Sequence, residues 1–227
     1  MKYDTLLIDI DNTLFDFDAA QDIAFEKVLE DLGIPYSEAI KQKYLETSHS
    51  LWKGYEEGRN SKDDIWNKRF VITTEGYDVP YTGLEMDDMF RAHLAANNIY
   101  MPYAEEFLQA VADDFRLVVV TNGVSETQFL RLKNAGITDL FELVVVSSDT
   151  GYAKPHNGFF DYAFDRLDNV DLSRTLILGD SLTADMQGGI NAGISTCWYN
   201  PKGVENTTTI GVDYEVHDLR DVLEIVR

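Results

Sequence analysis

Short apolar runs rich in β-branched residues recur along this chain of 227 residues, and each run gives way to polar residues. Runs of this length and composition are typical of buried strands in a parallel sheet. Helix-like segments separate the later runs from one another, so we expect an α/β fold with a doubly wound parallel sheet. In such a fold, ligands bind beyond the carboxyl ends of the strands. The runs span residues 3–10, 117–121, 143–147, 176–179 and 195–199.

The long segment between the first run and the second has no strand-like pattern. It has several stretches of helical periodicity instead, among them residues 19–32 and 84–96. We therefore expect residues 16–100 to form an all-α domain. This domain would be inserted into an α/β core made of residues 1–15 and 101–227.

Charge restricts the partners of this chain. It has 19 Lys and Arg residues against 40 Asp and Glu residues, so its formal net charge is −21. A field of this sign repels the phosphates of DNA and RNA, and we do not expect a nucleic acid polymer as a partner. The same field opposes small phosphate esters unless a metal ion and a well-placed lysine offset it. Adjacent acids such as Asp87 and Asp88 are expected on solvated helix faces.

No feature of the sequence indicates a membrane or secreted protein. No apolar stretch approaches the roughly 20 residues that span a bilayer, and the first residues lack the pattern of a secretory signal. The single cysteine, Cys197, lies in the apolar string STCWY, where we expect a buried structural thiol. We therefore expect a cytoplasmic protein with no membrane partner.

Two aspartates, Asp9 and Asp11, end the first run in the string DIDNTLF. Residues two apart in a strand share a face, so both carboxylates would point the same way at the strand end. Two like charges so close together are costly without a cation. Taken alone, the string is more typical of a solvated turn or a helix cap, because such short patterns occur often by chance.

Two of the later strand ends offer groups that could hold a phosphate. Thr121, Asn122 and Gly123 end the second run, and their hydroxyl and backbone N–H groups suit a phosphate cradle, although Asn-Gly is also an ordinary turn. The string GYAKP places Lys154 just before a helical segment, where its charge would offset the acidity of the chain. A lone lysine is more often simply solvated.

The fourth run leads into GDSLTAD, which sets Asp180 and Asp185 at another strand end. Carboxylate oxygens are the hard ligands that Mg²⁺ prefers, although Asp180 is as well placed to cap a helix. The four polar segments follow four different runs in one order, at predicted strand ends. Turn chemistry alone does not explain that arrangement.

This ordered set resembles the haloacid dehalogenase superfamily, whose motifs are D-x-D-x-T, a strand-terminal Ser or Thr, a Lys, and G-D-x-x-x-x-D. The resemblance implies a Rossmann-like core, and it implies that the inserted segment is the superfamily's helical cap. One departure is Asn12, where many members have Gly. Since Asn tolerates left-handed backbone geometry better than other residues with a side chain, we expect little consequence.

The resemblance also implies a mechanism. Asp9 would attack phosphorus and form an aspartyl-phosphate, while Asp11 would act as general acid and then as general base. Thr121, the N–H of Asn122 and Lys154 would hold the phosphoryl oxygens. Asp11 favours phosphate esters over dehalogenation, because the dehalogenase branch lacks this second acid. A phosphomutase would use the same two aspartates and stays open.

The metal implied by the resemblance is Mg²⁺, with Mn²⁺ as the alternative. Its ligands would be Asp9, the backbone carbonyl of Asp11 and Asp180. Asp185 would be a direct ligand or would support the others.

Several strings resemble those of the superfamily's house-cleaning pyrimidine 5'-nucleotidases, which act on dUMP, dTMP, UMP and modified analogues. The resemblance implies a nucleoside monophosphate as the small-molecule partner, and we expect the protein to be a monomer or a homodimer. Within the first string, Trp52 and Tyr55 could stack on the base or enclose it. Their helical spacing fits packing inside the cap as well, and for Trp52 periodicity favours packing. The strings are LWKGYEEG, TNG, GYAKP and GGINAGISTCWYN.

Three groups of alternative functions stay open on the sequence. A small sugar-phosphate phosphatase or a phosphomutase would have the same core and differ only in the cap. A receiver-type signalling domain also pairs acids with Thr and Lys, but the long insertion and GDSLTAD argue against it. A non-catalytic phosphate-binding protein would keep the fold alone, and the presence of every catalytic residue type argues against that.

Overall fold

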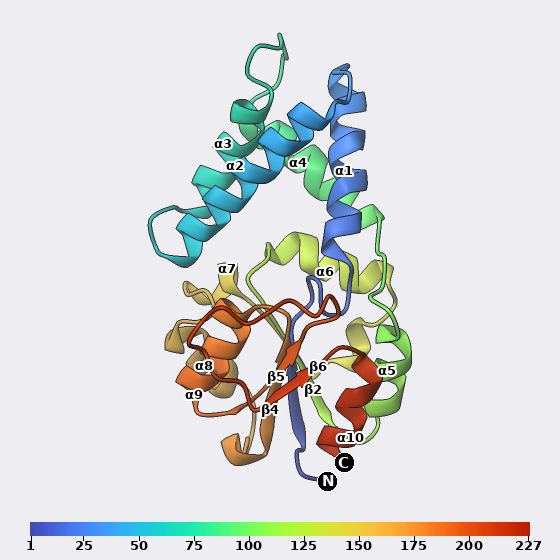
Figure 1. Cartoon of the computed structure of the whole chain (residues 1–227), viewed down its shortest axis with the longest axis vertical. Helices are drawn as coiled ribbons and strands as arrows, with labels where there is room; N and C mark the ends of the chain where they lie inside the picture. The colour runs from blue at the N-terminus through green and yellow to red at the C-terminus, as the bar shows by residue number, and fades with distance from the viewer. The chain divides into compact units, whose positions relative to one another are not determined.

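The computed structural model describes residues 1–227, with the side chain of Glu56 outside the description. Contacts divide the chain into two compact units. The core unit consists of Met1–Phe17 and Asn98–Arg227, and the helical unit consists of Asp18–Asn97 (Figure 1). In the described part of the chain, no helix combines the length and the apolar composition needed to cross a bilayer.

The core unit is built on a six-stranded parallel sheet with the order β3-β2-β1-β4-β5-β6. Strand β1 lies inside the sheet, where Leu6 pairs with Leu117 of β2 and Leu176 of β4. The α/β fold expected from the apolar runs is thereby confirmed. The strands are β1 (Thr5–Ile8), β2 (Arg116–Thr121), β3 (Leu143–Val146), β4 (Thr175–Gly179), β5 (Ser195–Tyr199) and β6 (Tyr214–Val216). The edge strand β6 was not expected, because three residues are too few to form an apolar run.

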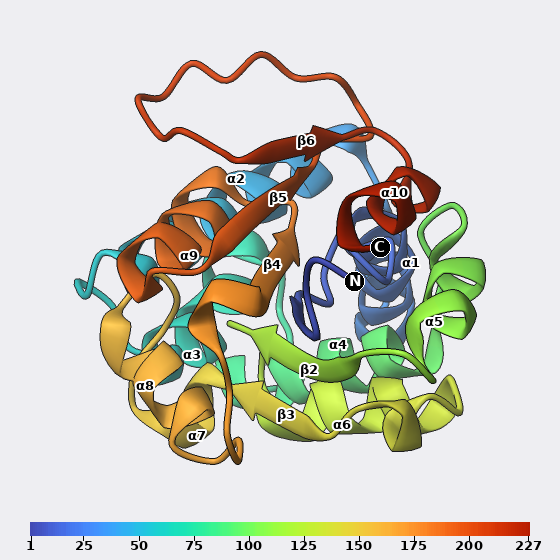
Figure 2. The ribbon, with the colours of Figure 1, turned by 90° about the horizontal axis from the view of Figure 1, so that it is seen from below.

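Helices cover both faces of this sheet, because successive strand residues point to opposite sides. Leu6 and Ile8 pack with residues of α5, α6 and α10 on one face, while Leu7 packs with residues of α8 on the other. Figure 2 shows these helices around the sheet. The helices of the core unit are α5 (Ala104–Val111), α6 (Ser125–Asn134), α7 (Ser147–Thr150), α8 (Asn157–Phe164), α9 (Gln187–Ala192) and α10 (Val222–Val226). Shorter helical turns lie at Thr138–Leu140, Leu172–Arg174, Leu182–Met186 and Leu219–Asp221.

The helical unit contains four helices, and no strand occurs among its described residues. They are α1 (Phe17–Leu32, which starts at the last residue of the core segment), α2 (Glu38–Glu56), α3 (Lys62–Thr73) and α4 (Gly83–Ala96). Aromatic rings fill its centre: Tyr44 stacks on Phe25 at 4.4 Å between ring centroids and also contacts Phe70 and Phe90. The helical character expected for this segment is confirmed. Within α2, only the last residues, around Trp52 and Tyr55, had shown helical spacing in the sequence.

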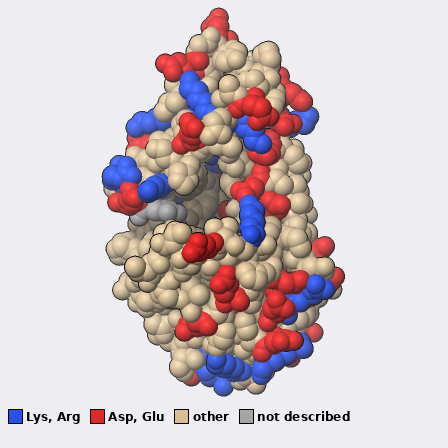
Figure 3. Space-filling model, viewed as in Figure 1, with Lys and Arg blue, Asp and Glu red and all other residues tan. Residues whose placement is uncertain are grey.

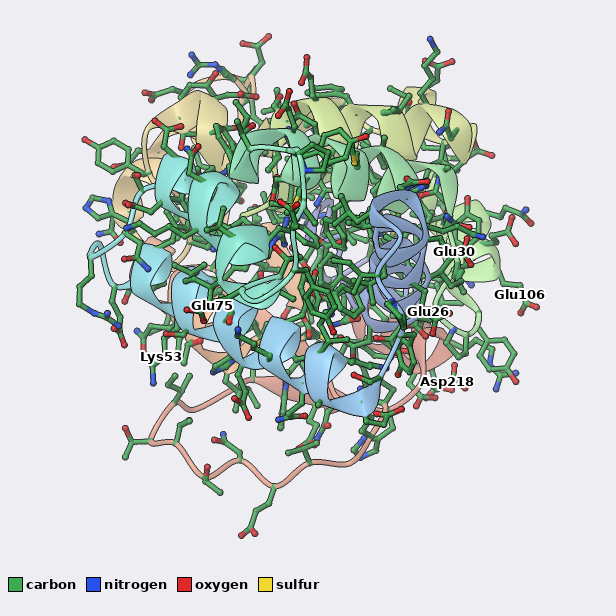
Figure 4. All side chains as sticks on the ribbon, turned by 90° about the horizontal axis from the view of Figure 1, so that it is seen from above. Glu26, Glu30, Lys53, Glu75, Glu106 and Asp218 are labelled. Atoms are coloured by element: carbon green, nitrogen blue, oxygen red, sulfur yellow. The ribbon has the colours of Figure 1, made fainter. Side chains whose placement is uncertain are left out.

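Most acids of the helical unit lie on exposed helix faces, and Glu26 and Glu30 point outward from α1 (Figure 4). Asp87 corrects that expectation. Its carboxylate is fully buried and accepts hydrogen bonds from Arg69 and, at 2.9 Å, from Arg91, whereas the neighbouring Asp88 is exposed. Burial of a carboxylate requires charged or hydrogen-bonded partners, and the two arginines supply them. On the surface, acidic atoms are spread over the visible face (Figure 3).

Candidate active site

Several of the site residues predicted from the sequence lie at the carboxyl ends of neighbouring strands. Asp9 directly follows β1, Thr121 is the last residue of β2, and Asp180 directly follows β4. The backbone N–H of Asp9 donates to the carbonyl of Leu178 at 3.0 Å, which extends the pairing of β1 with β4 by one residue. Because β1 lies between β2 and β4, its end is flanked by groups from both neighbours.

Lys154 reaches this strand edge from the loop before α8. Its side chain is buried, and its three ammonium hydrogens have three acceptors: Asp9 Oδ1 at 2.7 Å, Asp185 Oδ1 at 2.6 Å and the carbonyl of Val120 at 2.8 Å. Burial lowers the pKa of Lys154, but the carboxylates of Asp185 and Asp9 outweigh it and raise the pKa above its ordinary value. The ammonium group therefore stays charged at neutral pH.

Asn122 fixes the loop that holds Lys154. The side-chain Nδ2 of Asn122 donates to the carbonyl of Lys154 at 3.0 Å, and the N–H of Lys154 donates to Asn122 Oδ1 at 2.8 Å. Ser147 donates from its hydroxyl to the carbonyl of Asn122 at 3.0 Å. Two reciprocal bonds of this kind leave the loop little freedom, so the side chain of Asn122 has a positioning role that the sequence did not indicate.

A sharp turn after β4 brings Asp185 back toward the strand end. Asp185 lies in the turn Leu182–Met186, and its Oδ2 accepts from the N–H of Ser181 at 3.1 Å. Gly179 leaves the space for this carboxylate, since a Cβ at Gly179 would lie 2.3 Å from Asp185 Cγ. The carbonyl of Asp180 accepts a hydrogen bond from Trp198 Nε1 at 2.8 Å, and this bond fixes the backbone of Asp180.

Asp9, Asp180 and Asp185 form a group that fits a divalent cation. Each offers a carboxylate oxygen, and these oxygens lie within 4.8 Å of one another. Burial raises the pKa of Asp9 to about 7 against the effect of Lys154, and burial followed by the charges of Asp9 and Asp185 raises the pKa of Asp180 well above its ordinary value. One ammonium group cannot balance three carboxylates, and hard oxygen ligands of this kind suit Mg²⁺.

The carboxylate of Asp11 is not part of that group and faces helix α6 instead. Its Oδ1 accepts from Arg131 Nη1, and its Oδ2 accepts from Gln128 Nε2 at 2.8 Å. Neither of these α6 residues was expected from the sequence. The signal that could have found them is their spacing, since residues three apart share a helix face and two polar side chains there would face the strand ends.

The turn after Asp9 has the backbone geometry expected from Asn12. Its φ angle is 59°, in the left-handed region that Asn tolerates. The N–H of Asn12 donates to the carbonyl of Phe15 at 2.7 Å, and its Oδ1 accepts from the N–H of Phe17 at 3.0 Å. Asn therefore serves the turn with both its backbone and its side chain.

The two aromatic residues proposed for the base lie on α2 of the helical unit. Trp52 and Tyr55 contact each other edge to face, with 5.8 Å between their ring centroids, and both are only partly buried. Trp52 is thus not a member of the fully buried core of that unit. A substrate-binding role for these rings stays a prediction.

Comparison with known proteins agrees with this geometry. A family model described as haloacid dehalogenase-like hydrolase matches residues 3–193. The pyrimidine 5'-nucleotidase PynA of Streptococcus pneumoniae is 35% identical over 99% of this chain and 95% of its own length. The pyrimidine 5'-nucleotidase YjjG of Escherichia coli is 32% identical over 96% of this chain and 98% of its own length.

A solved structure resembles the whole chain as well. The magnesium-bound crystal structure of the protein designated HAD-hydrolase YfnB, from Bacillus subtilis, superposes with a TM-score of 0.92 at 36% identity and covers 100% of both chains. Our chain therefore belongs to the haloacid dehalogenase-like hydrolase family. It is a phosphatase of that family.

Proposed function

We propose that this phosphatase hydrolyses pyrimidine nucleoside 5'-monophosphates through a covalent intermediate on Asp9, with Mg²⁺ as its metal. The observation that carries the proposal is the buried group in which Lys154 bridges Asp9 and Asp185 beside Asp180. The names of PynA and YjjG support the choice of substrate, and the magnesium in the YfnB structure supports the choice of metal.

The reaction has two halves. An Asp9 oxygen attacks phosphorus, the bond from phosphorus to the ester oxygen breaks, and Asp11 gives its proton to the departing alkoxide. A water oxygen then attacks phosphorus, its proton passes to Asp11, and the bond from phosphorus to Asp9 breaks. The products are a nucleoside, inorganic phosphate and the regenerated carboxylate of Asp9.

The phosphoryl oxygens would be held by groups already at the strand ends. The Thr121 hydroxyl, the N–H of Asn122 and the Lys154 ammonium supply donors and a fixed positive charge. Asp9, Asp180 and Asp185, together with the backbone carbonyl of Asp11, would hold the metal. When bound, Mg²⁺ supplies positive charge that offsets the negative charge of the phosphoryl group and of its carboxylate ligands.

Specificity would come from the helical unit, which we propose to be the cap domain, spanning about residues 16–100. Trp52 and Tyr55 are the candidates for contact with the pyrimidine, because their rings are partly exposed on α2. A flat aromatic face can stack on a base, and such stacking is worth about 1–3 kcal/mol. A cytoplasmic location and a monomeric or homodimeric state stay predictions.

The test is a phosphate-release panel with and without Mg²⁺ and with Mn²⁺ in its place. The substrates are dUMP, dTMP, UMP, purine nucleoside monophosphates and sugar phosphates, and the blank is Asp9→Asn. We expect metal-dependent release that is greatest for the pyrimidine nucleotides and absent in the blank. Faster release from sugar phosphates would overturn the substrate class alone, and the transfer of phosphate within a sugar phosphate would indicate a mutase.

A further inference from the structure

Helix α6 presents a pair of polar side chains to Asp11, one for each oxygen of its carboxylate. Arg131 Nη1 donates to Oδ1 and Gln128 Nε2 donates to Oδ2 at 2.8 Å. The two are also joined to each other, since Arg131 Nη1 donates to Gln128 Oε1 at 3.0 Å. We call Gln128 and Arg131 the α6 clamp.

Arg131 is an unusual residue to bury. Its side chain is 0% exposed, and within the described part of the chain its Nε and Nη2 have no hydrogen-bond partner. The ring of Phe15, 5.0 Å from the guanidinium carbon, is its other neighbour of note. Burial of a guanidinium with unused donors has a cost in free energy that its few contacts have to offset. What Arg131 provides is a charged hydrogen bond to the carboxylate of Asp11.

Gln128 extends the clamp to the phosphate-binding side of the site. Its Nε2 lies 3.1 Å from Thr121 Oγ1 as well as 2.8 Å from Asp11 Oδ2, so one amide group bridges the ends of β1 and β2. The amide packs against Gly123, where a Cβ would lie 2.3 Å from Nε2. Gln128 is 2% exposed, so its amide is held away from solvent.

We propose that Gln128 and Arg131 are positioning residues that orient the carboxyl group of Asp11 for proton transfer. This inference rests on the proposed function. A carboxylate oxygen has two acceptor positions, so each Asp11 oxygen keeps one after the clamp has used the other. The free positions can exchange a proton with the ester oxygen and then with water. By holding Asp11 toward α6, the clamp also keeps its carboxylate out of the group formed by Asp9, Asp180 and Asp185.

The two aspartates of DIDNTLF thereby acquire different roles from different cations. Lys154 contacts Asp9 and Arg131 contacts Asp11, so different cations hold the two carboxylates although the residues are only two apart. In an in-line displacement the leaving oxygen lies on the far side of phosphorus from the attacking oxygen, so the nucleophile and the group that protonates the leaving oxygen have to reach opposite sides of the phosphoryl group. Separate anchoring of the two side chains serves that requirement.

The test compares esters that differ in their need for a proton. In Arg131→Met the leaving alkoxide of dUMP would lack a well-oriented acid, and we expect kcat to fall by about 100-fold or more. With p-nitrophenyl phosphate the nitrophenolate leaves without a proton, so the first turnover would stay within about tenfold of the wild-type rate. Since Asp11 is also needed as the base, we expect a burst of nitrophenolate followed by slow turnover.

Three further variants complete the experiment. Arg131→Lys keeps a cation and should recover part of the dUMP activity, and Gln128→Met should reproduce the burst if Arg131→Met does not fold. Lys133→Met removes an exposed cation two residues further along α6 and should behave as the wild type. Equal losses on both esters without a burst, or no loss on either, would overturn the clamp. A wild-type protein that releases phosphate from no ester would instead overturn the proposed function, and the clamp with it.

Discussion

Lys154 Nζ lies 2.6 Å from Asp185 Oδ1, although 31 residues separate them in the chain. The contact joins the loop before α8 to the turn after β4 inside a site that excludes water from the ammonium group. Removal of one partner from a buried pair leaves an uncompensated charge, which is why such pairs are costly to break.

We expect Lys154→Met to abolish most of the activity. The carboxylates of Asp9 and Asp185 would face each other without the ammonium group, and the phosphoryl group would lose its fixed positive charge. The expected loss in kcat is at least about 100-fold, measured by phosphate release at saturating Mg²⁺. Lys27→Met, which removes an exposed lysine on α1, is the control. An enzyme that keeps a tenth or more of its activity without Lys154 would contradict this role.

A methyl group at position 179 should disturb the proposed metal site although none of its proposed ligands is replaced. In Gly179→Ala the new Cβ would lie 2.3 Å from Asp185 Cγ, so Asp185 must move away from Ser181 and Lys154. We expect the stabilisation by Mg²⁺, measured as the rise in Tm on addition of the metal, to shrink together with kcat. In Gly211→Ala no atom lies within 4 Å of the new Cβ, so that variant should match the wild type in both measurements.

The response to pH should depend on the metal. Burial raises the pKa of folded Asp9 to about 7, against about 3.9 in an unfolded chain. The stabilising contribution of the protonated carboxyl is complete below about pH 3.9 and is lost as the pH rises through about 7, a loss on the order of 4 kcal/mol. In EDTA, Tm should therefore fall between pH 5 and pH 8.

Mg²⁺ would oppose this loss by binding the ionised carboxylates, so the Tm gained on adding Mg²⁺ should grow with pH. Asp9→Asn serves as the control, since it removes the titrating group while leaving the other acids of the chain in place. A wild-type pH profile identical to that of Asp9→Asn in EDTA would rule out this account of Asp9.

The buried acid of the helical unit offers a test of stability alone. Asp87→Asn would leave Arg69 without its carboxylate partner in a buried setting, and the free energy of unfolding should fall by about 3–5 kcal/mol. Asp88→Asn changes the exposed neighbour, and we expect a change of about 0.5 kcal/mol or less. Urea titration followed by circular dichroism measures both. Similar losses in the two variants would mean that the buried ion pairs of Asp87 stabilise the fold no more than the exposed carboxylate of Asp88 does.

Much of the core could be predicted because parallel strands bring their carboxyl ends to one edge. Residues directly at such ends, including Asp9, Thr121 and Asp180, follow from the position of the apolar runs. Cys197 was also predictable: it is fully buried, and burial raises the pKa of its thiol to about 12. The expected limits of the inserted segment, residues 16–100, came from where helical periodicity starts and stops, whereas contacts divide the chain after Phe17 and Asn97.

Contacts made by side chains in the middle of a helix, away from the strand ends, could not be predicted in the same way. Arg131 meets Asp11 across 120 residues, and the contact depends on how α6 is rotated against the sheet. Asp87 likewise pairs with Arg69 on another helix, while Asp88 beside it faces solvent. Charge pattern along the chain does not distinguish these two neighbours, because burial is decided by the packing partner of each helix face.

The position of β1 between β2 and β4 has a consequence for how the molecule is made. Its second neighbour, β4, ends only at Gly179, after the whole helical unit and most of the core have been synthesised. On the ribosome, the segment that carries Asp9 therefore emerges well before either of its sheet partners, β2 and β4. The apolar residues of β1 must meanwhile remain exposed or be held by another protein, so biogenesis of this enzyme should depend on chaperones more than that of a chain whose strands pair in order of synthesis.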